Sequence, residues 1–442
     1  MSKHHVFSLF AVVVLVALIA AACAPQAPTT TAPEGPAATA APVSPADVKG
    51  TVKFYKGPFG PDEMAQQNGY IAEFNKVYPN VKMTFETFDW PTQEAQLTAA
   101  IAGCTHNMIY VPEGMYPKFC YKGGPLTDLS SYVNDPSFKE TKDNILYWDV
   151  ATSPDGVLCG VPNVWIPESH YVANLDMLKA AGCPDDWDSS MDKVRECAIA
   201  IKTKFPENYG IAFRTAGLAN FSQHDWYGYI LRAGGNYLTK DFQACGLNTP
   251  EVVQTLQWLV DLQNKDKVTP EFGAYTWDGL RGLFQGGKLG IMHDEPPIAG
   301  VLASNPPGFE YKFFGIPGLK NNNLITFRGF YVIPECSKDK EAAFEAIKFW
   351  VQQEVMVNYL NGTAGLYPVA KDTHGIPVFP NDPVLADGMN LAQYAEGPQF
   401  HPQMLEFQNL FQHLFDEMMQ GNITPQEAVD QACEQIEAKL KK

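Results

Sequence analysis

Signatures of several enzyme classes and of nucleic-acid-binding proteins are missing from this chain of 442 residues. It contains no G-x-S-x-G nucleophile sequence, no G-x-x-x-x-G-K-[ST] or G-x-G-x-x-G phosphate loop, and no H-E-x-x-H zinc helix. Basic residues are also few, because 32 Lys and Arg stand against 49 Asp and Glu, for a net charge of −17. Nucleic acids select basic surfaces, so we expect no nucleic acid partner.

The chain has one long apolar run, and it lies at the N-terminus. Residues from Phe7 to Ala22 are apolar or small apart from Ser8, and Lys3 precedes them. The run is short for a transmembrane helix and is typical of a secretory signal over residues 1–22. Residues 23–49 then consist mainly of Ala, Pro, Thr and Ser, a composition that predicts an extended tether.

The small residues before Cys23, followed by this tether, resemble the processing site of bacterial lipoproteins. The resemblance implies that Cys23 carries a lipid and anchors the exported protein at the outer face of the cell membrane or in the periplasm. Ordinary signal cleavage, with Cys23 free or paired, is the alternative.

Eight further cysteines remain, at positions 104, 120, 159, 183, 197, 245, 336 and 433. An even number in an exported protein favours disulfides, although the spacing does not reveal the pairing. A second interpretation is that several are small buried residues. No C-x-x-C spacing occurs and the histidines are scattered singly, so we expect no metal site and no cofactor.

Beyond the tether, strand and helix patterns alternate. Strands are predicted at residues 50–56, 81–85 and 107–111, with helices at 62–77 and 91–102 between them. This order is typical of an α/β fold with a parallel sheet. Further helices are predicted at 176–181, 192–204, 221–233, 250–264, 277–284, 338–353 and 424–440, and further strands at 289–292 and 327–333.

Four tryptophans lie in or beside predicted loops or helix starts, at positions 90, 165, 226 and 277. In open α/β sheets ligands bind beyond the carboxyl ends of the strands, and aromatic faces stack on the C–H faces of sugars. A core role for each tryptophan is the alternative. The adjacent Asp294 and Glu295 could serve glycoside chemistry, but neighbouring acids in a loop need not converge, so we do not expect an enzyme.

Several phrases occur in an order that resembles one family. They include Phe74-Asn75-Lys76-Val77-Tyr78-Pro79-Asn80-Val81, Gly160-Val161-Pro162-Asn163, Tyr171-Val172-Ala173-Asn174-Leu175-Asp176 and Phe284-Gln285-Gly286-Gly287-Lys288. In this order the chain, from about Gly50 to Lys442, resembles the extracellular solute-binding proteins of ABC importers, family 1. This group contains maltose-binding protein.

The resemblance implies a type II periplasmic-binding-protein-like fold, with mixed parallel sheets flanked by helices in two lobes. Lobe 1 would comprise residues 50–165 and 330–368, and lobe 2 residues 166–329 and 369–442. Hinge crossings are expected near residues 164–170, 326–330 and 365–371, with the ligand in the cleft between the lobes. By position in the family pattern, the candidate ligand-binding residues are Phe59, Trp90, Glu113, Trp165, Glu168, His224, Asp225, Trp226, Asp294, Glu295, Arg328, Tyr367 and Phe400.

Among these candidates, Trp90, Trp165 and Trp226 are expected as stacking platforms. The acidic residues would accept hydroxyl hydrogen bonds, and Arg328 would either donate to the ligand or form a salt bridge. The implied function is a monomeric substrate-binding subunit that delivers a sugar to membrane permease subunits. The alternatives are the same fold binding a polyol, glycerol phosphate or another small solute, and a secreted enzyme acting on polysaccharide. A phosphate ligand would require converging basic residues, of which the sequence indicates mainly Arg328.

Overall fold

The computed structural model of the chain describes residues 44–60, 62–168, 170–215, 223–318, 324–362, 366–379, 383–386, 395–397 and 399–441. The predicted signal peptide, Cys23 and the tether up to residue 43 lie outside the described residues. The chain from Ser44 to Lys442 forms one compact unit.

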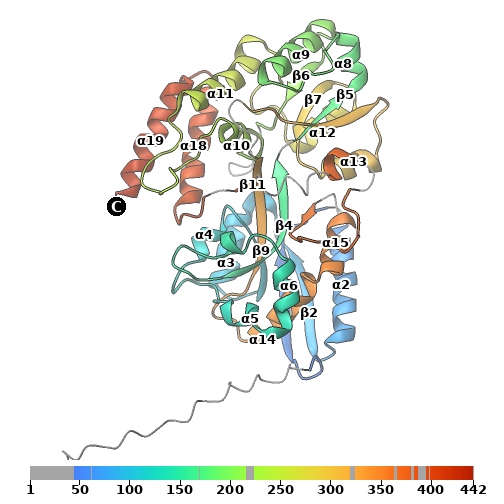
Figure 1. Cartoon of the computed structure of the whole chain (residues 1–442), viewed down its shortest axis with the longest axis vertical. Helices are drawn as coiled ribbons and strands as arrows, with labels where there is room; N and C mark the ends of the chain where they lie inside the picture. Colours follow the sequence, from blue (N-terminus) through green and yellow to red (C-terminus); the bar gives the residue numbers. More distant parts are fainter. Residues whose placement is uncertain are drawn as a thin grey trace, which may run out of the picture. The chain divides into compact units, whose positions relative to one another are not determined.

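Two β-sheets organise this unit (Figure 1). We call the part built on the first, seven-stranded sheet the first lobe, and the part built on the four-stranded sheet the second lobe. The first sheet has the strand order β10-β4-β9-β3-β1-β2, with β11 paired to β9, and the second has the order β6-β7-β5-β8. This mixed α/β architecture confirms the predicted fold class.

The chain enters the first lobe and builds most of it before crossing to the second. Its elements there are β1 (Gly50–Lys56), α2 (Glu63–Val77), β2 (Val81–Thr87), η1 (Trp90–Thr92), α3 (Gln93–Ala102), β3 (Met108–Pro112), α4 (Tyr116–Phe119), α5 (Ser130–Val133), η2 (Pro136–Phe138), α6 (Lys139–Asn144), α7 (Trp148–Ala151) and β4 (Gly160–Glu168). Strand β1 is parallel to both β2 and β3, as the alternating strand and helix patterns predict.

The second lobe follows directly. It contains β5 (His170–Asn174), α8 (Leu175–Ala181), α9 (Met191–Lys204), β6 (Tyr209–Ala212), α10 (Gln223–Arg232), α11 (Pro250–Val260), the π-helical turn η3 (Asp261–Lys265), α12 (Trp277–Gln285), β7 (Leu289–Asp294), α13 (Ile298–Ser304) and β8 (Tyr311–Gly315). Each predicted helix of this region coincides with an observed one to within a few residues.

The chain then returns to the first sheet and afterwards leaves it again. The remaining elements are β9 (Leu324–Val332), α14 (Lys340–Trp350), α15 (Gln353–Gly362), β10 (Tyr367–Pro368), α16 (Pro383–Ala386), β11 (Ala395–Glu396), α18 (Met404–Met419) and α19 (Pro425–Leu440). Helix α19 begins with the capping box expected from its sequence, because the side chains of Thr424 and Glu427 each bond the other's backbone N–H.

Strands β4 and β9 are the long antiparallel pair of the first sheet. The sequence pattern predicted no strand at β4, because Pro162 and Pro167 interrupt it. Its register against β9 shifts between Pro162 and Val164, so a local irregularity accommodates the first proline. The first sheet therefore includes residues 166–168 and 324–329, which the sequence analysis assigned to lobe 2.

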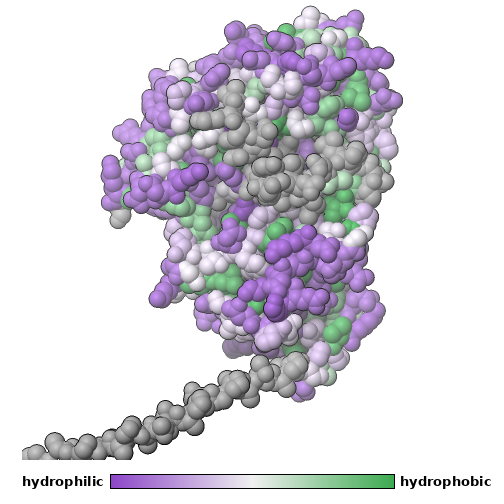
Figure 2. Space-filling view, in the orientation of Figure 1, coloured by the Kyte–Doolittle hydropathy of each residue, from purple (hydrophilic) through white to green (hydrophobic). Residues whose placement is uncertain are grey.

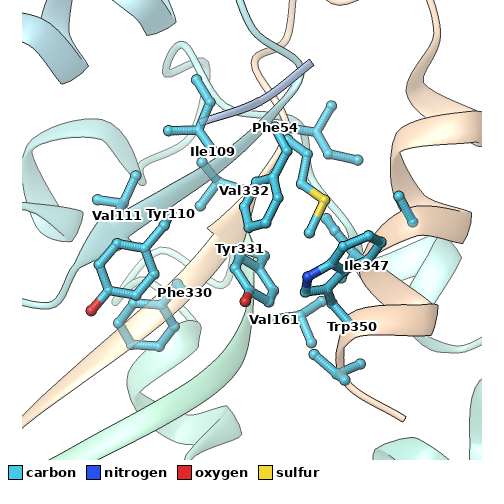
Figure 3. Packing of buried hydrophobic residues seen from close by; sticks show 14 of the residues in the cluster. Phe54, Ile109, Tyr110, Val111, Val161, Phe330, Tyr331, Val332, Ile347 and Trp350 are labelled. Carbon is cyan, nitrogen blue, oxygen red and sulfur yellow. The ribbon is translucent and has the colours of Figure 1, made fainter. Parts of the chain in front are cut away.

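The core of the first lobe packs on both sides of this sheet. Phe54 of β1 contacts Tyr331 of β9 at 5.5 Å and Trp350 of α14 at 5.6 Å between ring centroids, and Figure 3 shows these rings grouped between strand and helix. In the second lobe, the strict alternation of β5 sends Tyr171 and Ala173 into one core cluster and Val172 into another. Trp258 and Trp350 are buried, which confirms their predicted core roles.

Four disulfides join the eight cysteines of the described chain: Cys104–Cys336, Cys120–Cys159, Cys183–Cys197 and Cys245–Cys433. The disulfide prediction is confirmed. The first two bonds lie in the first lobe and the last two in the second. On the face shown in Figure 2, hydrophilic residues predominate and hydrophobic ones form small, separate patches.

Candidate functional site

A cavity of about 480 Å³ is lined by residues of both lobes. Its volume lies in the range of small-molecule binding sites. The first lobe contributes Pro58, Phe59, Trp90, Pro91, Gln93, Tyr110, Pro112, Gly114, Met115, Ile166, Phe327, Arg328 and Leu366. The second contributes Arg214, Thr276, Trp277, Asp278, Arg281, Glu295 and Pro297, and helix α18 adds Leu405 and Gln408.

The first-lobe wall is aromatic. The rings of Phe59 and Trp90 stack with centroids 6.1 Å apart and planes 10° apart, and Tyr110 meets Phe59 edge-on at 5.5 Å. Trp90 donates its indole N–H to the carbonyl oxygen of Pro58 at 2.8 Å, which orients the ring. These rings follow the carboxyl ends of β1 and β2 or lie in β3, the edge at which α/β sheets bind ligands.

Two glycines allow these rings to approach the backbone. A side chain at Gly57 would lie 2.5 Å from the indole of Trp90, and one at Gly329 would lie 2.0 Å from the ring of Tyr110. Real side chains do not tolerate such distances, so glycine is needed at both positions for the wall to form.

The second-lobe wall consists of an indole between charged groups. The guanidinium carbons of Arg214 and Arg281 each lie 4.3 Å from the ring centroid of Trp277. Asp294 accepts two hydrogen bonds from Arg281, from Nε at 2.8 Å and from Nη2 at 2.7 Å, and a third from the Trp277 indole at 2.6 Å. This bidentate pair holds Trp277 and Arg281 together as a unit.

Buried carboxylates stand behind the arginines of this wall. Asp225, fully buried, accepts a hydrogen bond from the backbone N–H of Arg214 and lies 3.4 Å from its Nη2. Burial raises the pKa of Asp225 to about 7 although Arg214 opposes the change, and burial likewise raises the pKa of Asp294 above its usual range.

A third ion pair joins Arg328 of β9 to Glu113, which follows β3. Glu113 Oε1 lies 3.1 Å from Arg328 Nη1, and Oε2 accepts the backbone N–H of Arg328 at 2.9 Å. Burial raises the pKa of Glu113 to about 7, against the effect of Arg328. The Arg328 guanidinium also lies 4.7 Å from the ring centroid of Tyr147.

The structure brings four of the predicted site residues to the cavity wall: Phe59, Trp90, Glu295 and Arg328. Glu113, Asp225 and Asp294 lie directly behind the wall, each paired to an arginine that lines the cavity. They position arginine side chains rather than form the surface of the cavity.

Trp165, Trp226 and Tyr367 do not line the cavity, because all three are fully buried in the lobe cores. Trp165 donates its indole N–H to the carbonyl of Pro368 at 3.1 Å, and its neighbour in β4, Ile166, is the residue on the wall. Successive side chains of a strand face opposite sides of the sheet, so Trp165 faces the core while the next residue, Ile166, faces the cavity. Trp226 stacks on Phe415 of α18 at 4.3 Å.

Three further predicted residues also fall outside the wall or the described side chains. Phe400 is half-buried and meets Tyr116 edge-on at 5.9 Å. Glu168 ends β4 and His224 lies in the first turn of α10, but the side chains of both are outside the described part of the chain.

Four prominent wall residues were absent from the predicted site: Tyr110, Arg214, Trp277 and Arg281. Trp277 was noted as a loop tryptophan, and its place at the start of α12 was the available signal. Arg214, after β6, follows a strand end as ligand-binding residues commonly do. Arg281 carries no local signal, because only the packing of α12 against β7 brings it to Asp294.

The described residues contain no group of three or more His, Cys, Asp or Glu side chains placed to hold a metal ion. None of the helices in the described chain combines the length and the apolar composition that a membrane crossing requires.

Comparisons with known proteins point in one direction. A family model with the description "Bacterial extracellular solute-binding protein" matches residues 69–386. A protein of Brucella abortus (strain 2308) with the name "Putative binding protein" is 22% identical over 410 residues, which cover 90% of this chain and 94% of that protein.

Two solved structures have a similar fold. One is an ABC transporter solute-binding protein from Thermotoga lettingae bound with alpha-D-tagatose, with a TM-score of 0.77 and 21% identity over 88% of this chain and 99% of that one. The other is the maltose-bound MalE3 of T. maritima, with a TM-score of 0.75 and 19% identity over 87% of this chain and 98% of that one.

Proposed function

Because the chain belongs to the family of bacterial extracellular solute-binding proteins, we propose that it is the substrate-binding subunit of an ABC importer. It captures a carbohydrate in the cavity between its lobes and delivers it to the permease subunits in the membrane. The sugar-bound state of the similar Thermotoga protein supports this choice of ligand class.

The observation that carries the proposal is the chemistry of the cavity. Its first-lobe wall presents the rings of Phe59, Trp90 and Tyr110, whereas its second-lobe wall presents guanidinium groups and Glu295. A sugar has C–H faces that stack on aromatic rings and hydroxyl groups that bond charged side chains. A cavity with both kinds of wall therefore suits a sugar better than a wholly apolar solute.

We assign direct ligand contacts to Phe59, Trp90, Glu295 and Arg328, together with Tyr110, Trp277 and Arg281. Glu113, Asp225 and Asp294 then act as positioning residues that orient the three wall arginines. The roles expected for Glu168, His224 and Phe400 remain predictions.

The lobes close on the ligand by a hinge motion. The chain leaves the first sheet after β4, returns to it at β9, and after β11 continues into α18 and α19, whose residues join the core of the second lobe, which supports a boundary close to the predicted one. Each disulfide of the described chain joins two cysteines of the same lobe, so these bonds brace the lobes without tying them together.

The same proposal covers location and the absence of turnover. The protein is exported, carries a lipid on Cys23, acts as a monomer and binds its ligand without converting it. The signal-like residues 1–22 and the tether support the first two points. The membership of a binding-protein family supports the last.

Tryptophan fluorescence of the chain from Ser44 onward, titrated with mono- and oligosaccharides, tests the proposal. Trp90 and Trp277 line the cavity, so binding changes their emission. Trp90→Phe and Trp277→Phe should each reduce the signal. Trp148→Phe is the matched control, because Trp148 is half-buried, bonds the carbonyl of Lys142 and does not line the cavity.

A saturable response to one sugar, with the sugar recovered intact, is the expected result. No response to any sugar, combined with a response to an amino acid or another unrelated solute, would remove the carbohydrate claim. Consumption or cleavage of the sugar would instead indicate an enzyme.

A further inference from the structure

At the cavity, the positively charged arginine side chains line the surface and their carboxylate partners lie behind them. Arg214 follows β6, Arg281 lies in α12 and Arg328 in β9. All three line the cavity, and no lysine or histidine is among the described lining residues. Their paired carboxylates, Asp225, Asp294 and Glu113, are 0%, 1% and 4% exposed and lie behind the lining.

Each ion pair therefore points its positive end into the cavity. A guanidinium group only donates hydrogen bonds, so the wall calls for acceptor oxygens on the ligand. Low dielectric strengthens such interactions inside the protein. Glu295 is the buried carboxylate on the described wall and Asp278 an exposed one, and both suit ligand hydroxyl groups.

Arg281 and Arg328 differ in whether the Nε–Nη2 edge of the guanidinium is paired with a carboxylate. Arg281 presents its Nε–Nη2 edge to Asp294, with both hydrogen bonds below 3 Å. The same edge of Arg328 has no such partner, since Arg328 meets Glu113 through Nη1. Among the described residues, Arg328 Nε is buried without any hydrogen-bond partner.

A buried donor that makes no hydrogen bond destabilises the empty protein and favours any ligand that supplies the acceptor. The Nε–Nη2 edge fits the two oxygens of a carboxylate or a phosphate, as Asp294 demonstrates on Arg281. Arg328 lines the cavity although it is only 3% exposed, so little water competes with a ligand group that reaches this edge.

We propose that the ligand is an acidic one, a sugar or polyol bearing a carboxylate or phosphate group that the Nε–Nη2 edge of Arg328 binds. This inference rests on the proposed function, because it specifies the ligand class of the same cavity. The aromatic wall holds the C–H face of the ligand, and the arginines hold its anionic end.

Calorimetric titration of the full chain in detergent with matched pairs of solutes tests the inference. The pairs are glucose and glucuronate, galactose and galacturonate, and glycerol and glycerol 3-phosphate. We expect one acidic member to bind roughly 10–100-fold more tightly than its neutral counterpart, as charged hydrogen bonds imply. Comparison of the uronate and phosphate arms identifies which anionic group the site takes.

Variants of the Glu113–Arg328 ion pair test whether Arg328 causes the preference for the acidic ligand. Arg328→Gln should abolish the preference for the acid. The double variant Glu113→Gln and Arg328→Gln should do so without leaving a buried charge unpaired, which separates binding from folding. Arg195→Gln is the control, because Arg195 pairs with Asp261 and Asp266 in the second lobe outside the described lining, and it should keep the preference.

The outcomes distinguish the two proposals. If a neutral sugar binds as tightly as its acid, or if the folded double variant keeps the preference, the inference is overturned while the carbohydrate function stands. If no sugar, sugar acid or phosphate in the panel binds, both proposals fail together.

Discussion

The two walls of the cavity use aromatic residues in different ways. In the first lobe, Phe59 and Trp90 are half-buried, and their rings form the wall itself. In the second lobe, Trp226 is turned into the core, and Trp277 lies against two guanidinium groups. The first wall thus offers mainly ring faces, with Arg328 as its guanidinium among the described lining residues, and the second offers oriented hydrogen-bond donors. On the proposed function, rings and donors would contact different parts of one ligand.

The largest expected effect contrasts the core tryptophan with the wall tryptophan. Trp226→Ala should lower the free energy of unfolding by about 3–5 kcal/mol, because it empties a fully packed site beside Phe415. Trp90→Ala, at a half-buried ring, should cost less than half as much. Chemical denaturation measures the free energy of unfolding of both variants. Equal losses would contradict the assignment of Trp226 to the core and of Trp90 to the cavity wall.

The second prediction concerns the anchor of the second wall. Asp294→Asn removes the charge that Arg281 and Trp277 bond, and leaves a guanidinium whose side chain is only 13% exposed without its carboxylate. We expect a loss of about 3 kcal/mol in the free energy of unfolding. Asp186→Asn is the control, because the exposed Asp186 pairs with Lys193 at the surface, and it should change stability by less than about 1 kcal/mol. A loss as small as in the control would show that Asp294 does not anchor the wall.

The third prediction tests the first wall through ligand binding. Trp90→Ala should weaken binding by about 1–2 kcal/mol, roughly tenfold, because the stacking face is lost. Trp148→Ala should leave affinity unchanged, since Trp148 lies outside the described lining. Calorimetry with the identified ligand measures both, and unaltered affinity in Trp90→Ala would exclude Trp90 as a stacking platform.

The smallest expected effect is on the pH dependence of stability. The pKa of Glu113 is raised from an ordinary 4.5 to about 7, so the folded state binds more protons than the unfolded state between these values. Its contribution to stability is therefore fully present below pH 4.5 and is lost as pH rises through about 7. Glu113→Gln should remove this decline, a change of about 1–2 °C in Tm per pH unit. Melting curves from pH 4.5 to 7.5 test it, and an unchanged slope would contradict the raised pKa.

The local elements were predictable because their signals are local. The alternating patterns of β1 and β2, the short apolar run of β3 and the capping box of α19 depend on residues close in sequence. Strand β4 was not predictable from its pattern, because two prolines mask a strand that the pairing with β9 stabilises. The cavity wall shows the same limit of sequence-based prediction. Phe59 and Trp90 could be predicted because they follow strand ends, whereas the position of Arg281 depends on its pairing with Asp294.

The sequence by itself determined the α/β class, the spans of the main helices, the presence of disulfides and the resemblance to solute-binding proteins. These features depend on composition, on short periodic patterns and on phrases in a fixed order. Only the tertiary structure decided the disulfide pairing, the burial of Trp165 beside the cavity-lining Ile166, and the convergence of three arginines. Such choices depend on which face of a strand or helix meets which distant partner, and contacts between distant residues set that face.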